Sequence, residues 1–341
     1  MNSKTLQGQI TYEQIVINKN LKYFKSSSLQ NQKTFAAELQ TSLNSTPKYI
    51  SPKFFYDENG SNLFDEICSL PEYYPYDSEI EILKNIESGI KPYVDSDIRL
   101  VELGSGSSIK TRLLLNALYN IQKNVEYFPI DISDILSHSV QELCNRYNDL
   151  KITGLIDTYE NGLNFIEHYD DKPNLISFLG SSFGNFNHDE GMKFLKTIHD
   201  MMKHSDFLLI GFDLKKDAVI LHNAYNDSKG ITAKFNLNVL NRINRELEAD
   251  FDLTKFAHYA FYNELSSRIE MHLKSLQSQK IKIPGANITI SLAKDELIHT
   301  ENSYKFSISE LESKFTKSGF EINEIWCDSN RYFALILAQK I

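Results

Sequence analysis

Short apolar segments alternate with amphipathic ones over the middle of the chain, and this alternation constrains the fold more than any other feature of the sequence. The apolar segments have the length of strands, and the segments between them have the apolar spacing of helices. Strands that alternate with helices in this way form a parallel sheet covered by helices on both faces. We therefore predict strands at 98–104, 125–131, 151–157, 174–180 and 206–213, and helices at 110–119, 135–147 and 192–202.

The rhythm changes after Asp213. The pattern beyond it predicts, in order, mostly helix at 214–260, strands within 268–292, a helix at 307–320 and a closing hairpin of 321–328 and 332–340. The region between the fifth strand and the last helix has about ninety residues, which is too long for a simple connection. We therefore assign it, together with the N-terminal segment, to a second lobe.

The predicted organisation is thus two units, each built from two parts of the chain. Residues 60–213 plus 306–341 form the sheet domain, and residues 1–59 plus 214–305 form the second lobe. The first strong helical pattern begins only near residue 33, and the residues before it are polar. We therefore expect the extreme N-terminus to be loosely held.

Charge and cysteine content narrow the class of protein. Lys+Arg 36 against Asp+Glu 45 give a formal net charge of −9, which repels a phosphate backbone, so we expect no nucleic-acid partner. No apolar run has the length of a membrane span, and the N-terminus does not resemble a secretion signal, so we expect no membrane association. The cysteines lack metal-ligand spacing, so no metal is expected. We expect a monomer in the reducing cytoplasm that acts on a small molecule.

The most informative short stretch is LVELGSGSSIKTRLLL (100–115), in which a strand leads through a glycine turn into a helix. Gly104 and Gly106 let the backbone turn tightly and approach a ligand without a Cβ in the way. A dinucleotide fingerprint requires a third glycine where Ile109 stands, so the turn is typical of a nucleotide-type site other than one for NAD. Taken alone, the turn is also compatible with a plain link between strand and helix.

Two carboxylates stand near this turn. Glu102 precedes Gly104, and Asp131 ends the next strand, where the hydroxyl pair of a ribose would lie. S-adenosylmethionine (SAM) carries a positive sulfonium and no phosphate, so acidic residues favour it where they would oppose a pyrophosphate. The sequence therefore predicts SAM as the cofactor.

Longer stretches in both predicted units carry a resemblance to a known family. They are FFYDENGSNLFDEICSLPEYYP, LVELGSGSSIKTRLLL, FPIDIS, FLGSSFGNF, AYNDSKGITAKFNLNVLNRINRELEADFDL, RIEMHL and TENSYKF. Together they resemble the histidine Nα-methyltransferases of the ergothioneine pathway, over roughly residues 50–341. The resemblance implies an α/β fold of the class I methyltransferase type. Its Rossmann-like sheet would be seven-stranded and mostly parallel, with a C-terminal antiparallel hairpin, beside a substrate-binding lobe.

The resemblance also implies an activity and a set of cofactor residues. The enzyme would use SAM to trimethylate the α-amino group of L-histidine, giving hercynine. Gly104 matches the family's glycine beside the cofactor, Lys110 its lysine near the methionine carboxylate, and Asp131 its ribose ligand. Asp157 aligns with the acid near the adenine, although the local sequence GLIDTYE departs from the usual pattern.

On the amino-acid side, the resemblance implies two catalytic residues, Tyr56 and Asn185. Tyr56 in FYD matches a tyrosine close to the reacting amine. Asn185 and Tyr225 match the residues that hold the histidine carboxylate, and Asn185 also lies near the amine. Asn185 has support from the pattern itself, because it follows the end of the fourth strand, where open α/β sheets bind ligands.

Four further positions match the part of the site that surrounds the imidazole. Tyr73 faces the ring, Met271 forms an apolar wall beside it, and Glu301 and Ser303 grip its two nitrogens. An imidazole has two distinct nitrogens, so a pocket that selects it over a phenyl or indole ring needs a hydrogen-bond partner at both. Glu301 and Ser303 can supply that pair.

Other functions stay open at this stage. The same scaffold with a reshaped pocket would methylate another amino acid or an indole amine, and a relative that kept only the fold would bind SAM without catalysis. Retention of Met271, Glu301 and Ser303 favours histidine. An NAD-dependent oxidoreductase is disfavoured by Ile109 at the third glycine position.

Overall fold

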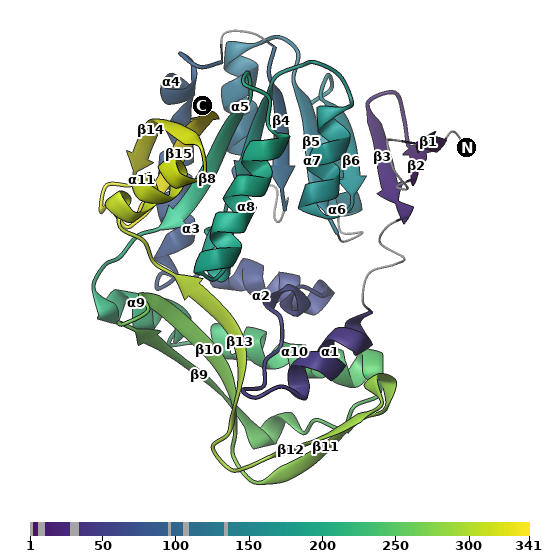
Figure 1. The fold of residues 1–341 in the computed structure, drawn as a ribbon, viewed down its shortest axis with the longest axis vertical. Coiled ribbons are helices and arrows are strands. Elements are labelled where there is room, and N and C mark those ends of the chain that lie inside the picture. The colour runs from purple at the N-terminus through teal and green to yellow at the C-terminus, as the bar shows by residue number, and fades with distance from the viewer. Residues whose placement is uncertain (1–2, 6–10, 28–33, 95–96, 105–108, 133–135) are drawn as a thin grey trace.

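The predicted strands lie side by side in one sheet. The computed structural model describes residues 3–5, 11–27, 34–94, 97–104, 109–132 and 136–341, and its main sheet has the strand order β1-β2-β3-β6-β5-β4-β7-β8-β15-β14 (Figure 1). The strands expected from the alternation are parallel: β4 (Arg99–Leu103), β5 (Glu126–Asp131), β6 (Lys151–Ile156), β7 (Asn174–Phe178) and β8 (Phe207–Asp213). All residues of β4, β7 and β8 are buried, as expected for strands with both faces covered.

The chain closes the sheet with the predicted C-terminal hairpin. β14 (Phe320–Cys327) pairs antiparallel with β15 (Phe333–Lys340), and β15 pairs antiparallel with β8. These seven strands, from β6 through β5, β4, β7, β8 and β15 to β14, give the class I methyltransferase order that the resemblance implies. The predicted fold class is confirmed.

Helices cover both faces of the sheet, and two separate apolar cores result. One core lies between the sheet and α7 (Tyr159–Glu167), α8 (His188–Met201) and α11 (Ile308–Lys317). The other lies beneath α3 (Tyr74–Lys84), α4 (Ile86–Ile90), α5 (Ile109–Ile121) and α6 (Leu136–Arg146). Neighbouring residues of one strand serve different cores, since Leu100 faces the α5 side and Val101 the α8 side.

The N-terminal segment differs from the expectation. Residues 1–59 were predicted to belong to the second lobe, but β1 (Ser3–Thr5), β2 (Thr11–Val16) and β3 (Leu21–Ser26) extend the main sheet to ten strands. β3 lies parallel to β6, with Leu21 opposite Ile152. This pairing is possible because Gly154 of β6 has no side chain, so the ring of Tyr23 fills the space over it. A Cβ at Gly154 would lie 2.5 Å from the Tyr23 ring. The hairpin therefore covers β6, which would otherwise be an exposed edge strand.

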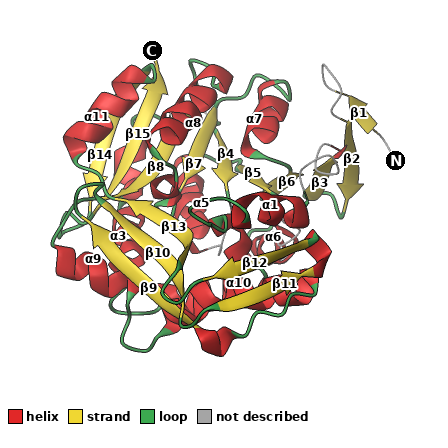
Figure 2. Ribbon diagram, turned by 60° about the horizontal axis from the view of Figure 1, so that its bottom comes forward, coloured by secondary structure: helices red, strands yellow, loops and turns green. Residues whose placement is uncertain are grey.

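The second lobe is built around one long helix and a small sheet. α10 (Ile231–Leu247) packs against α2 (Glu58–Cys68), α1 (Phe35–Leu43), the 3-10 turn η2 (Pro52–Phe55) and α9 (Ala218–Tyr225) in a third apolar core. A three-stranded antiparallel sheet lies beside it, in the order β13 (Leu297–Tyr304), β10 (Arg268–Ser275), β9 (Phe256–Asn263) (Figure 2). A two-stranded ribbon, β11 (Gln279–Ile283) and β12 (Ile288–Leu292), completes the lobe.

Some elements were not predicted from the sequence. β13 has two aliphatic residues at its start followed by mostly polar ones, so it has no long apolar run. β9 begins at Phe256, inside the region predicted as mostly helical. α2 packs against α10, so this helix lies with the second lobe although most of its residues were assigned to the sheet domain. Figure 1 shows β13 rising from the second lobe to the sheet domain.

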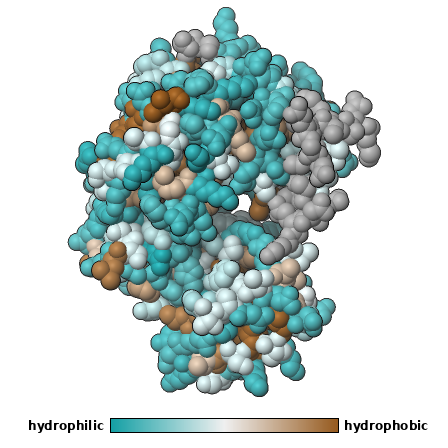
Figure 3. Space-filling model, viewed as in Figure 1, coloured by the Kyte–Doolittle hydropathy of each residue, from teal (hydrophilic) through white to brown (hydrophobic). Residues whose placement is uncertain are grey.

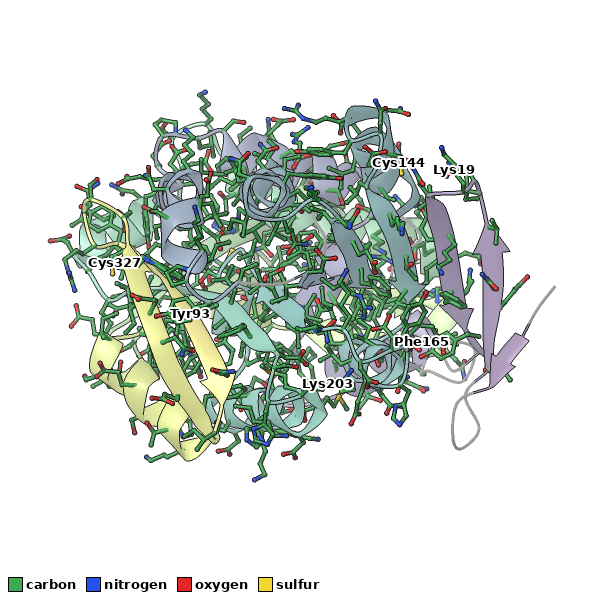
Figure 4. The ribbon with its side chains drawn as sticks, turned by 90° about the horizontal axis from the view of Figure 1, so that it is seen from above. Lys19, Tyr93, Cys144, Phe165, Lys203 and Cys327 are labelled. Atoms are coloured by element: carbon green, nitrogen blue, oxygen red, sulfur yellow. The ribbon has the colours of Figure 1, made fainter. Side chains whose placement is uncertain are left out.

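The cysteines lie apart in the structure. Cys68, Cys144 and Cys327 are all free thiols. Figure 4 shows Cys144 and Cys327 toward opposite ends of the main sheet, so these two cannot form a disulfide with each other without unfolding. Among the residues that the structure describes, no helix combines the length and the apolar character needed to cross a membrane.

The hydroxyl of Tyr12 generates a prediction about the N-terminal hairpin. It donates to the buried carboxylate of Asp157 at 2.8 Å, from β2 to the residue that follows β6. Tyr12→Phe removes a donor from a buried charged acceptor, so we expect the free energy of unfolding to fall by about 1–3 kcal/mol. Denaturant unfolding followed by circular dichroism measures it. The exposed Tyr259→Phe is the control, and a Tyr12→Phe effect no larger than the control's would contradict the prediction.

Candidate functional site

The glycine turn after β4 has a conformation and an environment that only glycine tolerates. Gly104 has a φ of +77°, in the left-handed region that favours glycine. A Cβ at this position would lie 2.8 Å from the hydroxyl oxygen of Tyr159, at the start of α7. Gly106, also singled out in the sequence, lies outside the described residues. Gly104 therefore brings bare backbone to the carboxyl end of β4, beside the half-buried Asp131 that ends β5.

Glu102 does not take the position expected for it. Its side chain lies under the turn, 2% exposed, where it accepts hydrogen bonds from the Tyr127 hydroxyl at 2.5 Å and the Thr111 hydroxyl at 2.8 Å. Burial raises the pKa of Glu102 to about 7. The expected pair of strand-end carboxylates is therefore reduced to Asp131, because Glu102 is a structural group that ties β4 to β5 and α5.

Lys110 enters the site from the first turn of α5. Its ammonium forms an ion pair of 2.6 Å with Glu79 of α3, and its Nζ lies 5.3 Å from the centre of the Tyr76 ring. Glu79 is fully buried and also accepts a hydrogen bond of 3.0 Å from the backbone N–H of Gly180, just after β7. One carboxylate thus joins α3, α5 and the end of β7. Sequence reasoning missed Glu79, although it stands as an acid within the apolar stripe of α3 that includes Ile82 and Leu83.

Asp157 follows the carboxyl end of β6, where the cofactor is expected, but the surrounding residues bury it completely. Its backbone N–H donates to the carbonyl of Asp131 at 3.1 Å, which places the two residues side by side. Its carboxylate accepts from the hydroxyl of Tyr12, the backbone N–H of Thr158 and the side-chain amide of Asn161, at 2.8, 2.8 and 2.9 Å. The residue has no exposed surface in this structure.

The residues expected around an imidazole meet on β10 and β13. Met271 and Glu301 are directly opposite each other in the antiparallel pair, and they are 1% and 9% exposed. Ser303 follows two residues after Glu301, so both side chains project from the same face of β13. The hydroxyl of Tyr225, at the end of α9, donates to Ser303 Oγ at 2.7 Å. A carboxylate, a hydroxyl and a thioether therefore form one buried wall.

The aromatic residues expected near the amine line the same region. The Tyr73 ring lies 6.3 Å from the Tyr225 ring and 6.2 Å from Phe64, and Tyr56 lies 5.6 Å from Phe64. Tyr56 is 39% exposed, but desolvation by the surrounding protein raises the pKa of its hydroxyl well above the usual value, and the charge on Glu301 raises it further. Tyr225 and Tyr159 also raise the pKa of Tyr56. The Tyr56 hydroxyl therefore lies near residues of both the second lobe and the sheet domain.

Asn185 closes the region from the sheet domain. It ends the 3-10 turn η3 (Ser182–Asn185), which follows β7 and starts at Ser181 with a φ of +58°. The preceding Gly184 packs directly on β13, because a Cβ there would lie 3.0 Å from the carbonyl oxygen of Tyr304 and 3.6 Å from Ser303 Oγ. This close approach brings Asn185 next to the wall that holds Glu301 and Ser303. Figure 3 shows that hydrophilic residues cover most of the visible surface of the molecule.

The geometry agrees with the comparisons with known proteins. The model of the family of SAM-dependent, histidine-specific methyltransferases matches residues 35–340. The chain belongs to this family. It is 38% identical over 308 residues to a histidine N-alpha-methyltransferase of Mycobacterium tuberculosis, covering 89% of this chain and 94% of the relative. A protein of the same name from Mycolicibacterium smegmatis is 37% identical over 304 residues, with the same coverage.

A fungal relative is longer. Ergothioneine biosynthesis protein 1 of Neurospora crassa is 31% identical over 304 residues, which cover 86% of this chain and 33% of the fungal protein. The family match begins at residue 35, so β1, β2 and β3 precede the part of the chain shared with the histidine-specific methyltransferases. The N-terminal hairpin therefore lies outside the region that the family model matches.

In this methyltransferase, burial opposes the ionisation of Glu301, the carboxyl group on β13. Burial raises its pKa to about 7, and the ammonium of Lys305 acts in the opposite direction. Sequence reasoning missed Lys305. It is 2% exposed, and its ammonium contacts Ser303 Oγ at 2.8 Å and Asp213 at 2.7 Å. A lysine two residues after Ser303, in the TENSYKF block, was the only signal available.

The raised pKa of Glu301 generates a prediction about stability. The pKa of the carboxyl rises from 4.5 to about 7 on folding. Between these values the folded state retains a proton that the unfolded state releases, so stability falls as pH rises through this window. Relative to wild type, Glu301→Gln should gain about 1.4 kcal/mol per pH unit between about pH 4.5 and 7 and level off above it.

Denaturant unfolding of both proteins from pH 5 to 8 measures this difference. Ser303→Ala is the control, because it alters the same face of β13 without removing a titratable group, and its difference from wild type should stay constant with pH. A constant difference for Glu301→Gln would contradict the buried, raised-pKa state of Glu301.

Proposed function

We propose that the protein transfers three methyl groups from SAM to the α-amino nitrogen of L-histidine, giving hercynine as in an ergothioneine-type pathway. The observation that carries this proposal is the pairing of Glu301 and Ser303 on one buried face of β13. One is a hydrogen-bond acceptor when ionised and the other carries a hydroxyl, and they are positioned against the turn that holds Asn185. A phenyl ring would leave both polar groups unpaired, which costs binding free energy.

The residues of the glycine turn fit the cofactor. Bound SAM supplies a methyl group on a positively charged sulfur, and S-adenosylhomocysteine is the leaving group. Gly104 gives the bare backbone against which the cofactor rests, since a Cβ there would already meet Tyr159. We assign Lys110 to the methionine carboxylate and Asp131 to the ribose hydroxyls. We assign Asp157 to the adenine edge, where it is held by Tyr12, Thr158 and Asn161.

We assign the amino-acid substrate to the opposite wall. Glu301 and Ser303 bind the two imidazole nitrogens, Met271 lies beside the ring, and Tyr73 faces it. Asn185 and Tyr225 hold the carboxylate from two different elements, η3 and α9. Because these side chains come from both lobes, the substrate is fixed at its ring and at its carboxylate, and the amine is directed toward the glycine turn.

The reaction depends on alignment of the reacting atoms more than on acid–base groups. Transfer of a methyl group from a sulfonium to a neutral amine spreads charge, so holding nitrogen, carbon and sulfur in line at near-attack distance supplies most of the acceleration, up to about 7–11 kcal/mol. Tyr56 and Asn185 orient the nitrogen. The pKa of Tyr56 lies above its usual value, so its phenol is protonated at neutral pH and can act as a hydrogen-bond partner of the amine.

Three successive transfers need space at the nitrogen. In this assignment Tyr56 comes from the second lobe, after η2, and Asn185 from the sheet domain, at the end of η3, so two groups contact the nitrogen and leave the rest of its surroundings to the methyl groups. The amine can therefore stay bound as it gains methyl groups.

We also propose that the protein works as a monomer in the cytoplasm, because all the assigned residues belong to one chain and its thiols suit a reducing compartment.

A substrate panel tests the proposed function. The purified protein is incubated with excess SAM and each of the twenty amino acids, and products are followed by mass spectrometry. We expect histidine alone to gain methyl groups efficiently and to end as the trimethylated product. Faster turnover of tryptophan would indicate a different substrate, and accumulation of monomethylhistidine as the final product would contradict the open arrangement at the amine.

Glu301→Ala tests the site assignment. Loss of a carboxylate that holds an imidazole nitrogen in a dry pocket should lower kcat/KM for histidine by an amount equivalent to about 2–4 kcal/mol. Glu296→Ala is the matched control, because Glu296 is a solvent-accessible carboxylate paired with Lys48 just before the same strand. Steady-state kinetics measures both variants, and equal kcat/KM values for them would remove Glu301 from the site.

A further inference from the structure

A buried carboxylate lies behind the lysine assigned to the cofactor. Glu79 of α3 has no exposed surface, and the Lys110 side chain, with which it forms an ion pair of 2.6 Å, is 16% exposed. An ammonium has three protons, and the contact with Glu79 uses one of them, so the others can point toward a ligand. Glu79 itself is too deeply buried to touch that ligand.

Two further contacts fix the position of the Glu79 carboxylate. The backbone N–H of Gly180, just after β7, donates to it, with the nitrogen 3.0 Å from each carboxylate oxygen. On β8, a Cβ at Gly211 would lie 2.5 Å from Glu79 Oε1, so the carboxylate fills space that the strand leaves free because residue 211 is a glycine. The sheet therefore holds Glu79 in place, and Glu79 in turn holds the lysine.

The flexibility of lysine gives this contact a function. A free lysine side chain has a long, flexible stem, and it loses much rotamer freedom when it binds a ligand group at one fixed position. The Glu79 carboxylate already holds the ammonium of Lys110 near the carboxyl end of β7, where open α/β sheets bind their ligands. The side chain is therefore ordered before the cofactor binds.

We propose that Glu79 is a positioning residue that holds the ammonium of Lys110 in place for the methionine carboxylate of SAM. This inference rests on the assignment of Lys110 under the proposed function and deepens it, since it adds to the cofactor site a residue that the cofactor does not touch. Its consequence is specific to one part of the cofactor. Glu79 should matter for ligands that carry the amino-acid carboxylate and should not matter for ligands that lack it.

Two ligands separate this role from a general structural one. S-adenosylhomocysteine and methylthioadenosine both carry adenosine and an uncharged sulfur, but methylthioadenosine lacks the amino-acid carboxylate. Glu79→Gln should raise the Kd of S-adenosylhomocysteine by about three- to tenfold, because the Lys110 side chain must then be ordered on binding. The Kd of methylthioadenosine should stay within about twofold of the wild-type value. Isothermal titration calorimetry measures both Kd values.

Glu102→Gln is the matched control, because Glu102 is also a buried carboxylate beside the glycine turn and its hydrogen bonds come from Tyr127 and Thr111. This variant should change the Kd of both ligands by the same factor. Circular dichroism and thermal unfolding check that the variants are folded. If Glu79→Gln does not fold, Glu79→Asp takes its place, since it keeps the charge on a side chain one methylene shorter and should weaken S-adenosylhomocysteine selectively in the same way.

A double-mutant cycle with Lys110→Met shows whether the effect of Glu79 passes through the lysine. Lys110→Met should raise the Kd of S-adenosylhomocysteine by about ten- to a hundredfold, because it removes a hydrogen bond between charged groups. It should leave the Kd of methylthioadenosine within about twofold of the wild-type value. In the Lys110→Met background, Glu79→Gln should cause no further loss of affinity for S-adenosylhomocysteine, because the group that Glu79 positions is gone.

The outcomes separate this inference from the proposal on which it rests. An unchanged or tighter affinity of Glu79→Gln for S-adenosylhomocysteine, or an equal loss for both ligands, would reject the positioning role and leave the assignment of Lys110 standing. Equal Kd changes for both ligands in Lys110→Met would reject that assignment and the inference with it. Methylation of histidine is decided separately, by the substrate panel.

Discussion

The buried ion pair between Asp213 and Lys305 joins the sheet domain to the second lobe at the point where the site lies, and it is reinforced by the backbone bridge between Leu214 and Phe306. Asp213 ends β8 of the sheet domain and Lys305 follows β13 of the second lobe, with 2.7 Å between the charged atoms and almost no exposed surface on either. Breaking a buried pair by removing one partner costs about 3–5 kcal/mol when a charge is left uncompensated. Removal of Asp213 would leave two ammonium groups buried, those of Lys305 and Lys216, so β13 is held tightly against the end of the main sheet.

The buried charges around Asp213 explain how the buried carboxyl of Glu301 can ionise at the site. Burial raises the pKa of Glu301 to about 7, and Lys305 acts against that rise. The charges of Lys305, Lys216, Asp213 and ionised Glu301 sum to zero, so the ionised form is balanced locally. A site built in this way binds through fixed hydrogen bonds more than through net charge, which suits a reaction that depends on alignment of the reacting atoms.

Much of the fold follows from the sequence because the apolar periods are strong. The parallel strands, the helices between them and the closing hairpin have long, uniform patterns, and the structure confirms them. β13 and the N-terminal hairpin were missed because their sequences have neither a long apolar run nor a regular alternation of polar and apolar residues. Their positions depend on partners distant in sequence, such as Gly154 beneath Tyr23 and Met271 opposite Glu301. Tertiary pairing of this kind overrides local propensity.

The sequence by itself determined the fold class, the family and the residue types of the site, since these reside in contiguous blocks such as LVELGSGSSIKTRLLL and TENSYKF. Tertiary structure alone decided which of those residues are exposed to a ligand and which are supports. Glu102 became a buried support beneath the glycine turn, and Lys305 became the group behind Ser303. Burial and hydrogen-bond partners set the charge and the direction of a polar group, and both arise only when distant segments pack together.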